Sequence, residues 1–303
     1  MTLAEGALVL VCTALMTITA RTQLVTLLGH PVEHSRSPTI HNAAFQAQGV
    51  NAVYVATPVH PEAIGDAVAG LRAMQVLGAN VTIPHKQTVM PHLDALTERA
   101  HALGAVNTIV RERDGKTLRL RGDNTDGAGF LRPLAPHADA LLNGEAVVFG
   151  AGGAARAVVH ALLDRLAPSR LTVVARRPAQ AEALAEAMAP FDANDGLRTR
   201  TFETAQPAVK AAHLLVNATP LGMVPDVERT PWPEARDFSE GQIAYDLVYN
   251  PAETRFLQDA AARGATPIGG WGMLIGQAAV AYSQWTGRDF PHDAVAKALS
   301  RNA

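Results

Sequence analysis

Lys86 closes a run of residues that sets a basic side chain beside polar ones. The run is Asn80-Val81-Thr82-Ile83-Pro84-His85-Lys86, and its apolar residues predict a strand over 78–83. Because residues two apart on a strand face the same side, Asn80 and Thr82 are expected on one face, with Lys86 beginning the next element. Ligands of α/β proteins bind at strand ends. Taken alone, a lysine is more often a solvated surface residue, so this run is a candidate site and no more.

Two serines stand just before a predicted helix over 37–49. In His34-Ser35-Arg36-Ser37-Pro38, Ser37 is expected to be the N-cap of that helix. Two hydroxyls, the free N–H groups of a helix start and the helix dipole together form a site for a carboxylate. Simple capping by Ser37 needs no ligand, although it leaves Ser35 without a role. Both interpretations stay open on these residues alone.

A glycine-rich turn follows an apolar strand that ends at Phe149. Its sequence, Gly150-Ala151-Gly152-Gly153-Ala154-Ala155, matches G-x-G-x-x-A and opens a predicted helix, as the dinucleotide fingerprint requires. Gly150 permits the tight turn, and Gly152 lets backbone N–H groups approach a pyrophosphate at the positive end of the helix. A glycine-rich turn without a ligand is the plainer alternative, but the strand and helix around it favour a nucleotide.

Arg176 and Arg177 follow the next strand, where a site for NAD would place Asp or Glu. Two guanidinium groups suit a 2'-phosphate. An arginine pair at a strand end is by itself more often a solvated edge. Together with the glycine fingerprint, it predicts NADP as the cofactor.

The elements that must position these residues alternate between short apolar runs and amphipathic stretches, which predicts an α/β fold. We expect strands over 24–29 and 51–57 besides the one at 78–83, a helix over 61–74, and a hairpin turning at Asp114-Gly115. After a proline-containing link a second parallel-sheet unit begins, with four apolar strands and a closing helix from Gly272. The chain is thus expected to form two domains.

Composition excludes several classes of protein. The 303 residues carry 26 Lys+Arg and 28 Asp+Glu, so a net charge of -2 gives no reason to expect nucleic acid or an acidic membrane as a partner. A single cysteine, Cys12, allows neither a disulfide framework nor a thiolate zinc site and fits a reducing, cytoplasmic setting. His34 and His41 have no carboxylate at complementary positions, so no metal is expected.

The first residues predict neither a membrane span nor a secretion signal. The apolar stretch from Ala7 to Met16 is about half the length of a membrane helix, and Glu5 is the only charge before it, where a signal peptide has a basic region. We interpret Met16 as the true start, with 1–15 as an upstream addition. Residues 1–21 are expected to form a disordered tail.

Eight motifs, in one order along the chain, resemble the shikimate dehydrogenase family. Singly each is weak, but together they cover nearly everything from residue 24 to 290. The motifs are Gly29-x-Pro31-x-x-His34-Ser35-x-Ser37-Pro38-x-x-His41-Asn42, Asn80-Val81-Thr82-x-Pro84-x-Lys86, Gly104-Ala105-Val106-Asn107-Thr108, Gly122-Asp123-Asn124-Thr125-Asp126-Gly127, Gly150-Ala151-Gly152-Gly153-Ala154, Asn217-Ala218-Thr219, Asp246-Leu247-Val248-Tyr249 and Gly272-Met273-Leu274-x-x-Gln277.

The resemblance implies a two-domain enzyme with a deep cleft. Residues 22–127 with 273–303 would form the α/β substrate-binding domain, and 128–272 a Rossmann-type NADP-binding domain. The implied reaction is the reversible NADPH-dependent reduction of 3-dehydroshikimate to shikimate, on the pathway to chorismate and the aromatic amino acids. The resemblance further implies a cytoplasmic enzyme that is a monomer or a homodimer and acts on a small molecule.

By the same resemblance Lys86 and Asp126 form the catalytic pair. Hydride arriving at the carbonyl carbon creates an alkoxide, which a protonated Lys86 can neutralise while Asp126 keeps the ammonium charged and in place. The implied substrate-binding residues are Ser35, Ser37, Asn80, Thr82, Asn107, Asp126, Tyr249 and Gln277. The implied cofactor-binding residues are Gly150, Ala151, Gly152, Gly153, Ala154, Arg176, Arg177, Glu98, Thr219, Leu247 and Gly270.

The chain departs from the family pattern at the expected phosphate-binding stretch. The family often has Asn-Arg-Thr followed three residues later by Arg, whereas here Ala175-Arg176-Arg177 is followed by Gln180. Two alternatives stay open: a quinate/shikimate dehydrogenase with broader substrate or cofactor use, and a non-catalytic nucleotide-dependent sensor on the same fold. Retention of both Lys86 and Asp126 argues against the sensor, which needs no proton donor.

Overall fold

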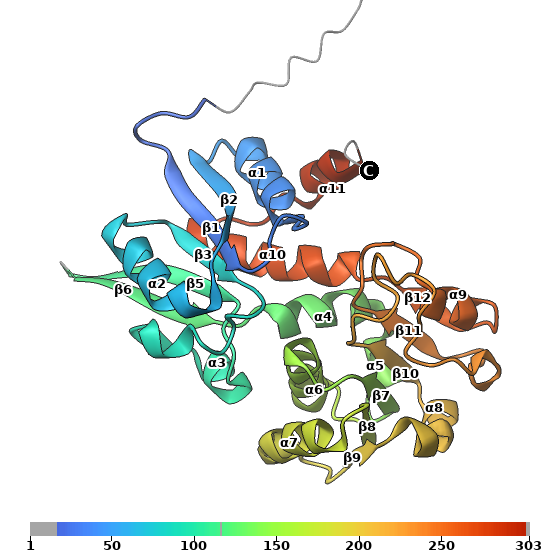
Figure 1. Cartoon of the computed structure of the whole chain (residues 1–303). Coiled ribbons are helices and arrows are strands. Elements are labelled where there is room, and N and C mark those ends of the chain that lie inside the picture. The colour runs from blue at the N-terminus through green and yellow to red at the C-terminus, as the bar shows by residue number, and fades with distance from the viewer. Residues whose placement is uncertain (1–16, 116, 301–303) are drawn as a thin grey trace, which may run out of the picture.

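A computed structural model describes residues 17–115 and 117–300 (Figure 1). The interpretation of residues 1–15 as an upstream addition lies outside these ranges. Residues 17–21 are exposed, and the hydroxyl of Thr22 donates a hydrogen bond to Oδ1 of Asn51 (2.8 Å). The described chain therefore joins the fold immediately before its first strand.

The first half of the chain builds a mixed six-stranded sheet in the order β2-β1-β3-β5-β6-β4. Its strands are β1 (Gln23–Gly29), β2 (Ala52–Pro58), β3 (Gly78–Val81), β4 (Ala95–Leu96), β5 (Thr108–Asp114) and β6 (Thr117–Asp123). β1, β2 and β3 are parallel, as the crossover helices between them require, whereas β5 and β6 pair antiparallel as the predicted hairpin.

Helices cover both faces of this sheet. They are α1 (Ser37–Ala47), α2 (Ile64–Ala73), α3 (Glu98–Leu103) and, from the end of the chain, α10 (Trp271–Thr286) and α11 (His292–Ser300). Side chains of β1 and β2 on one face share a core with α1, α10 and α11, while side chains of β1 and β3 on the other face share a core with α2. Alternation of side chains along each strand thus supplies both cores.

The second sheet is parallel throughout and has the order β12-β11-β10-β7-β8-β9. Its strands are β7 (Glu145–Phe149), β8 (Arg170–Val174), β9 (Leu197–Arg200), β10 (Leu214–Asn217), β11 (Ile243–Asp246) and β12 (Thr266–Ile268). The order reverses between β7 and β10, which is the topological switch point at which Rossmann-type sheets bind dinucleotides.

Helices also flank the second sheet on both faces. They are α5 (Ala138–Leu141), α6 (Gly153–Arg165), α7 (Pro178–Met188), α8 (Gln206–Ala211) and α9 (Arg255–Ala261). Short 3-10 turns lie at Pro61–Ala63, Met90–His92, Ala135–His137, Ala189–Phe191, Phe202–Thr204 and Ala235–Asp237. α6 and α7 share a core with one face, and α8 and α9 with the other.

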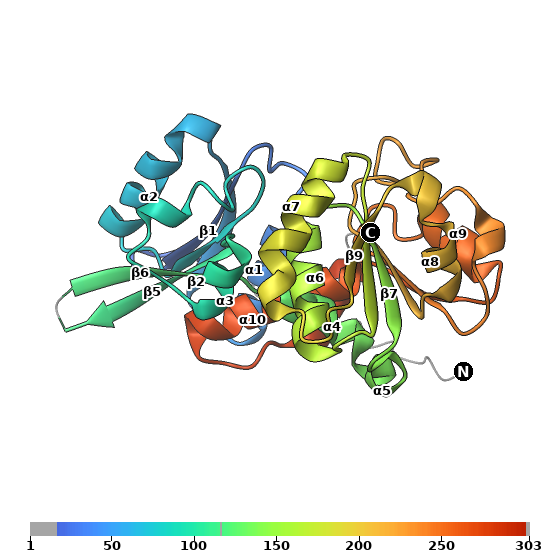
Figure 2. The same ribbon diagram turned by 90° about the horizontal axis from the view of Figure 1, so that it is seen from below.

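Two crossing helices join the sheets, α4 (Asp126–Leu134) and α10 (Figure 2). They cross closely because each carries a glycine at the contact: a Cβ on Gly129 would lie 2.6 Å from the backbone nitrogen of Gln277, and one on Gly276 would lie 2.9 Å from the Cα of Gly129. The predicted domain boundaries, 127/128 and 272/273, fall in the first turns of these helices.

Three local predictions differ from the structure. Ser37 is the first residue of α1 and not its N-cap, a position that Arg36 holds without a side-chain capping bond. The strand predicted over 78–83 ends at Val81, because the chain turns as the N–H of His85 bonds the carbonyl of Thr82 and Pro84 has no N–H to continue the ladder. The helix predicted over 37–49 ends at Ala47.

Candidate active site

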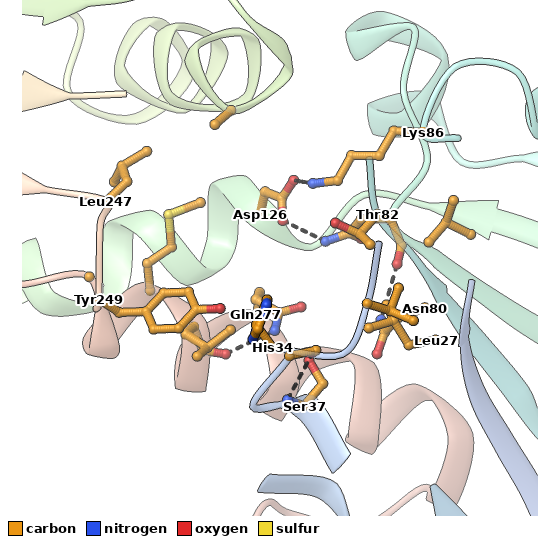
Figure 3. Close-up of a pocket in the computed structure, with 18 of the residues that line it drawn as sticks. Leu27, His34, Ser37, Asn80, Thr82, Lys86, Asp126, Leu247, Tyr249 and Gln277 are labelled. Carbon is orange, nitrogen blue, oxygen red and sulfur yellow. Dashed lines mark hydrogen bonds and ion pairs between the residues drawn. The ribbon is translucent and has the colours of Figure 1, made fainter. Parts of the chain in front are cut away.

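A cavity of about 360 Å³ lies between the two sheets, at the carboxyl ends of their strands (Figure 3). That volume suits a small ligand. All of the predicted catalytic and substrate-binding residues line it, together with three of the predicted cofactor residues. They are Ser35, Ser37, Asn80, Thr82, Lys86, Asn107, Asp126, Tyr249 and Gln277, with Ala154, Leu247 and Gly270.

Lys86 and Asp126 point toward one another and form an ion pair in the lining of this cavity (Figure 3). Lys86 lies in the turn that follows β3, and its backbone carbonyl accepts a hydrogen bond from the N–H of Val106. Asp126 is the first residue of α4. Nζ of Lys86 lies 2.5 Å from Oδ2 of Asp126, with the two side chains 22% and 9% exposed. The pair is thus shielded enough to hold one geometry, yet the ammonium still reaches the cavity.

Asn107 fixes the other carboxylate oxygen of this pair. Its Nδ2 donates to Oδ1 of Asp126 (2.7 Å) and also to Oγ1 of Thr125 (3.0 Å). Its Oδ1 accepts the backbone N–H of Thr125 (2.8 Å). Asn107 therefore ties the start of α4 to the start of β5, and its contact with the cavity is secondary to this bracing.

The two serines lie on one wall of the cavity. The backbone N–H of Ser37 donates to Oγ of Ser35 (3.2 Å), so the loop before α1 is ordered by Ser35 and not by a cap from Ser37. Tyr249 faces them from the second sheet, with its ring packed at 5.4 Å against Trp271. Burial raises the pKa of the Tyr249 phenol, which Arg36 partly offsets, so the phenol stays protonated at neutral pH and can donate a hydrogen bond.

Asn80, Thr82 and Gln277 complete the polar lining. Both amide hydrogens of Asn80 are used within the protein, by the carbonyl of Asn107 (3.0 Å) and Oγ1 of Thr108 (3.2 Å). Gln277 donates from Nε2 to the carbonyl of Leu274 (2.9 Å). Asn80 thus acts first as a brace, whereas Thr82 and Gln277 are better placed for direct contact.

The glycine-rich turn between β7 and α6 leaves room for a phosphate group. Gly150 has φ +109°, and a Cβ there would lie 3.0 Å from the carbonyl oxygen of Ala218. Above Gly152 and Gly153 the space is open, and no side chain caps the first turn of α6. Its N–H groups are therefore available to an anion, and the turn fits a dinucleotide.

The other predicted cofactor residues lie around this turn, with one exception. Arg176 and Arg177 are exposed just beyond β8, and Thr219 follows β10, where its N–H and Oγ1 both bond Oδ1 of Asn217 (3.0 and 2.7 Å). Glu98 is exposed at the start of α3, in the first half of the chain, and does not line the cavity.

A buried carboxylate supports the loop that carries Leu247 and Tyr249. Asp246, at the end of β11, accepts bonds from Nδ2 of Asn217 (2.9 Å), the N–H of Val248 (2.9 Å) and Oγ1 of Thr254 (2.6 Å). Burial raises the pKa of the Asp246 carboxyl to about 6, although these three bonds oppose the shift. Asp246 therefore holds the loops after β10 and β11 together.

Several lining residues were not predicted as site residues. They are Leu27, Pro31, Val32, His34, Val81, Met273 and Leu274. Most are apolar, and an apolar wall carries no chemical signal in one sequence; His34 and Met273 stood within motifs but without an assigned role. His41 is buried in the core. In the described ranges no three His, Cys, Asp or Glu side chains gather into a metal-binding group.

Comparisons with known proteins show the family of the chain. A model of the shikimate dehydrogenase substrate binding domain matches residues 27–109, and one of the shikimate 5'-dehydrogenase C-terminal domain matches 270–299. A shikimate dehydrogenase (NADP(+)) of Salinibacter ruber is 63% identical over 286 residues, which are 94% of this chain and 99% of that protein. The chain belongs to the shikimate dehydrogenase family.

Solved structures of related enzymes share the fold along nearly the whole chain. A shikimate 5-dehydrogenase from Thermus thermophilus, in complex with NADP(H) and shikimate, matches with a TM-score of 0.79 and 39% identity, covering 93% of this chain and 100% of that one. A quinate dehydrogenase from Corynebacterium glutamicum, in complex with NAD, matches with a TM-score of 0.84 and 29% identity, covering 92% and 99%. Fold alone therefore does not separate shikimate from quinate as substrate.

Proposed function

We propose that this chain is a shikimate dehydrogenase that catalyses the reversible NADP-dependent conversion of 3-dehydroshikimate to shikimate, in aromatic amino acid biosynthesis. The observation that carries the proposal is the ion pair between Lys86 and Asp126, 2.5 Å apart in a cavity that also holds two serine hydroxyls. This arrangement combines a proton donor with a carboxylate clamp. The 63% identity to a curated shikimate dehydrogenase supports the same reaction.

Lys86 is the proton donor in the direction of reduction. A bound nicotinamide cofactor supplies the hydride in this direction and accepts it in the other. As charge develops on the carbonyl oxygen, the Lys86 ammonium transfers a proton to it and is left neutral. Asp126 holds Nζ of Lys86 in place beside the cavity, and Asn107 fixes Asp126.

The remaining lining residues hold the substrate around this pair. Ser35 and Ser37, assisted by Tyr249, clamp the carboxylate with neutral donors. Thr82, Asn107, Asp126 and Gln277 contact the ring hydroxyls, and Asn80 braces them; together these are the predicted substrate residues. Neutral donors suffice because a carboxylate accepts several hydrogen bonds at once.

NADP is the cofactor that the residues of the second sheet favour. Gly150–Ala154 and the free N–H groups of α6 would hold the pyrophosphate, and Arg176 with Arg177 would bond the 2'-phosphate. Thr219, Leu247 and Gly270 would border the cofactor, and Glu98 would reach it from the first domain. We propose that residues 22–127 with 273–303 form the substrate domain and that residues 128–272 form the NADP domain.

The working form of the enzyme is a monomer or a homodimer in the cytoplasm that acts on a small molecule. None of the helices in the described ranges combines the length and apolarity needed to cross a bilayer.

A spectrophotometric assay that follows NADPH production tests the proposed function. With NADP as cofactor, shikimate should be oxidised far more efficiently than quinate. The oxidation of shikimate should also be more efficient with NADP than with NAD. Comparable turnover of quinate would instead support a quinate/shikimate dehydrogenase. Turnover of neither substrate would overturn the proposal and favour a non-catalytic nucleotide-dependent sensor.

A further inference from the structure

Arg156 joins the glycine-rich turn of the second sheet to the first half of the chain. It is the fourth residue of α6, and its backbone N–H donates to the carbonyl of Gly152 (3.1 Å), which closes the first turn of that helix. Its side chain reaches α3, where Nε donates to the carbonyl of Leu103 (3.0 Å), the last residue of α3. One residue therefore bonds both the turn that fits a dinucleotide and a helix of the other half of the molecule.

The carbonyl of Leu103 is a suitable partner for a cation. The last carbonyls of a helix have no N–H partner within the helix, and the helix dipole makes this end negative. α3 ends at Gly104, whose φ of +58° turns the chain toward β5. The guanidinium of Arg156 makes a charge-assisted bond here, which is stronger than a bond between neutral groups.

The residues that follow Leu103 lead directly to the catalytic pair. The N–H of Val106 donates to the carbonyl of Lys86 (2.7 Å). Nδ2 of Asn107 donates to Oδ1 of Asp126 (2.7 Å). A shift at the end of α3 would therefore move the backbone that supports the lysine together with the amide that fixes the aspartate.

A second contact holds α6 against the first half of the chain, where α3, α4 and α6 lie side by side (Figures 1 and 2). A Cβ on Gly127, next to the catalytic aspartate, would lie 3.4 Å from the Cβ of Ala161 and 3.5 Å from the carbonyl oxygen of Ala157. This contact is apolar and has no preferred direction, so α6 could pivot about it. The bond of Arg156 to α3 is directional, and the two contacts together fix the angle of α6.

We propose that Arg156 is a positioning residue that sets the cofactor-binding turn in register with the pair of Lys86 and Asp126. The reaction requires hydride and a proton at the two adjacent atoms of one carbonyl group, and the two halves of the molecule hold their donors. A misplacement of about 1 Å can lower the rate about 100-fold, even when the altered residue is far from the reacting atoms. The inference rests on the proposed function, because it requires both donors.

Arg156→Met tests this role, since it keeps an unbranched side chain and removes the guanidinium. We expect the rate of hydride transfer from shikimate to NADP in a single turnover to fall by roughly 10- to 100-fold, while both KM values stay within about threefold. Arg156→Lys keeps a cation that can bond the carbonyl and should recover most of the rate. Arg165→Met is the matched control, because Arg165 is the last residue of the same helix and is 71% exposed; it should change none of these values.

Amide hydrogen exchange of the protein without cofactor gives a readout that does not depend on turnover. The N–H groups of Gly104–Asn107 should exchange faster in Arg156→Met than in the unaltered protein or in Arg165→Met, because the end of α3 loses its bond to α6. An unchanged exchange rate would overturn the inference. So would an unchanged single-turnover rate, whether Tm falls, which would leave Arg156 a structural residue, or KM for NADP rises, which would make it a cofactor contact. Failure of the unaltered enzyme to oxidise shikimate would instead count against the proposed function.

Discussion

Nδ2 of Asn107 donates to Oδ1 of Asp126 at 2.7 Å, while the other oxygen of that carboxylate pairs with Nζ of Lys86 at 2.5 Å. One carboxylate is thus held from both sides, by a residue at the start of β5 and by one in the turn after β3. Because the orientation of this carboxylate is fixed, the Lys86 side chain that pairs with it has little conformational freedom. This arrangement explains how a flexible lysine side chain can be kept in one position for proton transfer.

Lys86→Ala should remove proton donation and leave the fold intact. We expect kcat for shikimate oxidation to fall by roughly 10² to 10⁴, the usual range for losing a general acid or base. Lys297→Ala, an exposed position on α11, serves as the control and should retain full activity. Steady-state kinetics with a melting curve for each variant provide the measurement. More than a tenth of the original kcat in Lys86→Ala would remove this residue from the mechanism.

Replacing Ser35 and Ser37 together by Ala should weaken binding of the substrate carboxylate. KM for shikimate should rise far more than kcat falls, because the carboxylate is remote from the reacting carbon and is bound similarly throughout the reaction. Initial rates over a range of shikimate concentrations give both constants. A lower Tm with KM unchanged would mean that the two hydroxyls serve the loop before α1 and not the substrate.

Arg176→Asp should change the choice of cofactor. A charge-assisted hydrogen bond contributes about 1.5 to 3 kcal/mol, so kcat/KM for NADP should fall at least about tenfold while that for NAD improves, because the carboxylate repels phosphate and accepts from ribose hydroxyls. Arg177→Ala should have a smaller, salt-sensitive effect. Arg165→Asp, exposed at the far end of α6, is the control.

The arginine prediction has a clear contrary result. If the unaltered enzyme used NAD as efficiently as NADP, the pair at 176 and 177 would be a solvated strand edge, and the glycine-rich turn alone would account for nucleotide binding.

Asp246→Asn should alter the pH dependence of stability. The folded-state pKa of Asp246 is raised from 3.8 to about 6, so the folded protein binds more protons than the unfolded chain between these values. The stabilising contribution of Asp246 to the free energy of unfolding is fully present below pH 3.8. It is lost as the pH rises to 6, at up to about 1.4 kcal/mol per pH unit. Relative to the unaltered protein, Asp246→Asn should therefore gain stability as pH rises from 4 to 6.5.

Urea unfolding at several pH values across that window measures the difference. The exposed Asp289→Asn is a suitable control and should run parallel to the unaltered protein. Parallel curves for Asp246→Asn as well would show that the carboxyl does not titrate as its burial implies.

Strands with strong apolar runs could be predicted from the sequence, and those without them could not. The three parallel strands of the first sheet and the hairpin at Asp114-Gly115 are confirmed, with an end shifted at β3. β4, β9 and β12 were missed, because they are short edge strands with few apolar residues; they exist through pairing with a neighbour. Their side chains are only partly buried or exposed, so no local pattern marks them.

Prediction of the cavity depended on resemblance more than on local chemistry. The sequence around Lys86 is typical of a surface turn, and its partner stands 40 positions later. Glu98 was carried over from the family and lies outside the cavity. Ser37 was assigned as a cap from its place before Pro38, but Arg36 occupies the cap position, and Ser37 lies in the first turn of α1 and lines the cavity.

The sequence by itself determined the features that depend on neighbours in the chain: the strand, glycine turn and helix at 145–165, the arginine pair after β8, and the alternation that produces two α/β units. Only the tertiary structure decided which side chains meet. Because α4 and α10 cross closely at Gly129 and Gly276, residues from both halves of the molecule line one cavity. Backbone preferences act over a few residues, whereas the pairing of Lys86 with Asp126 requires the packing of whole helices and sheets.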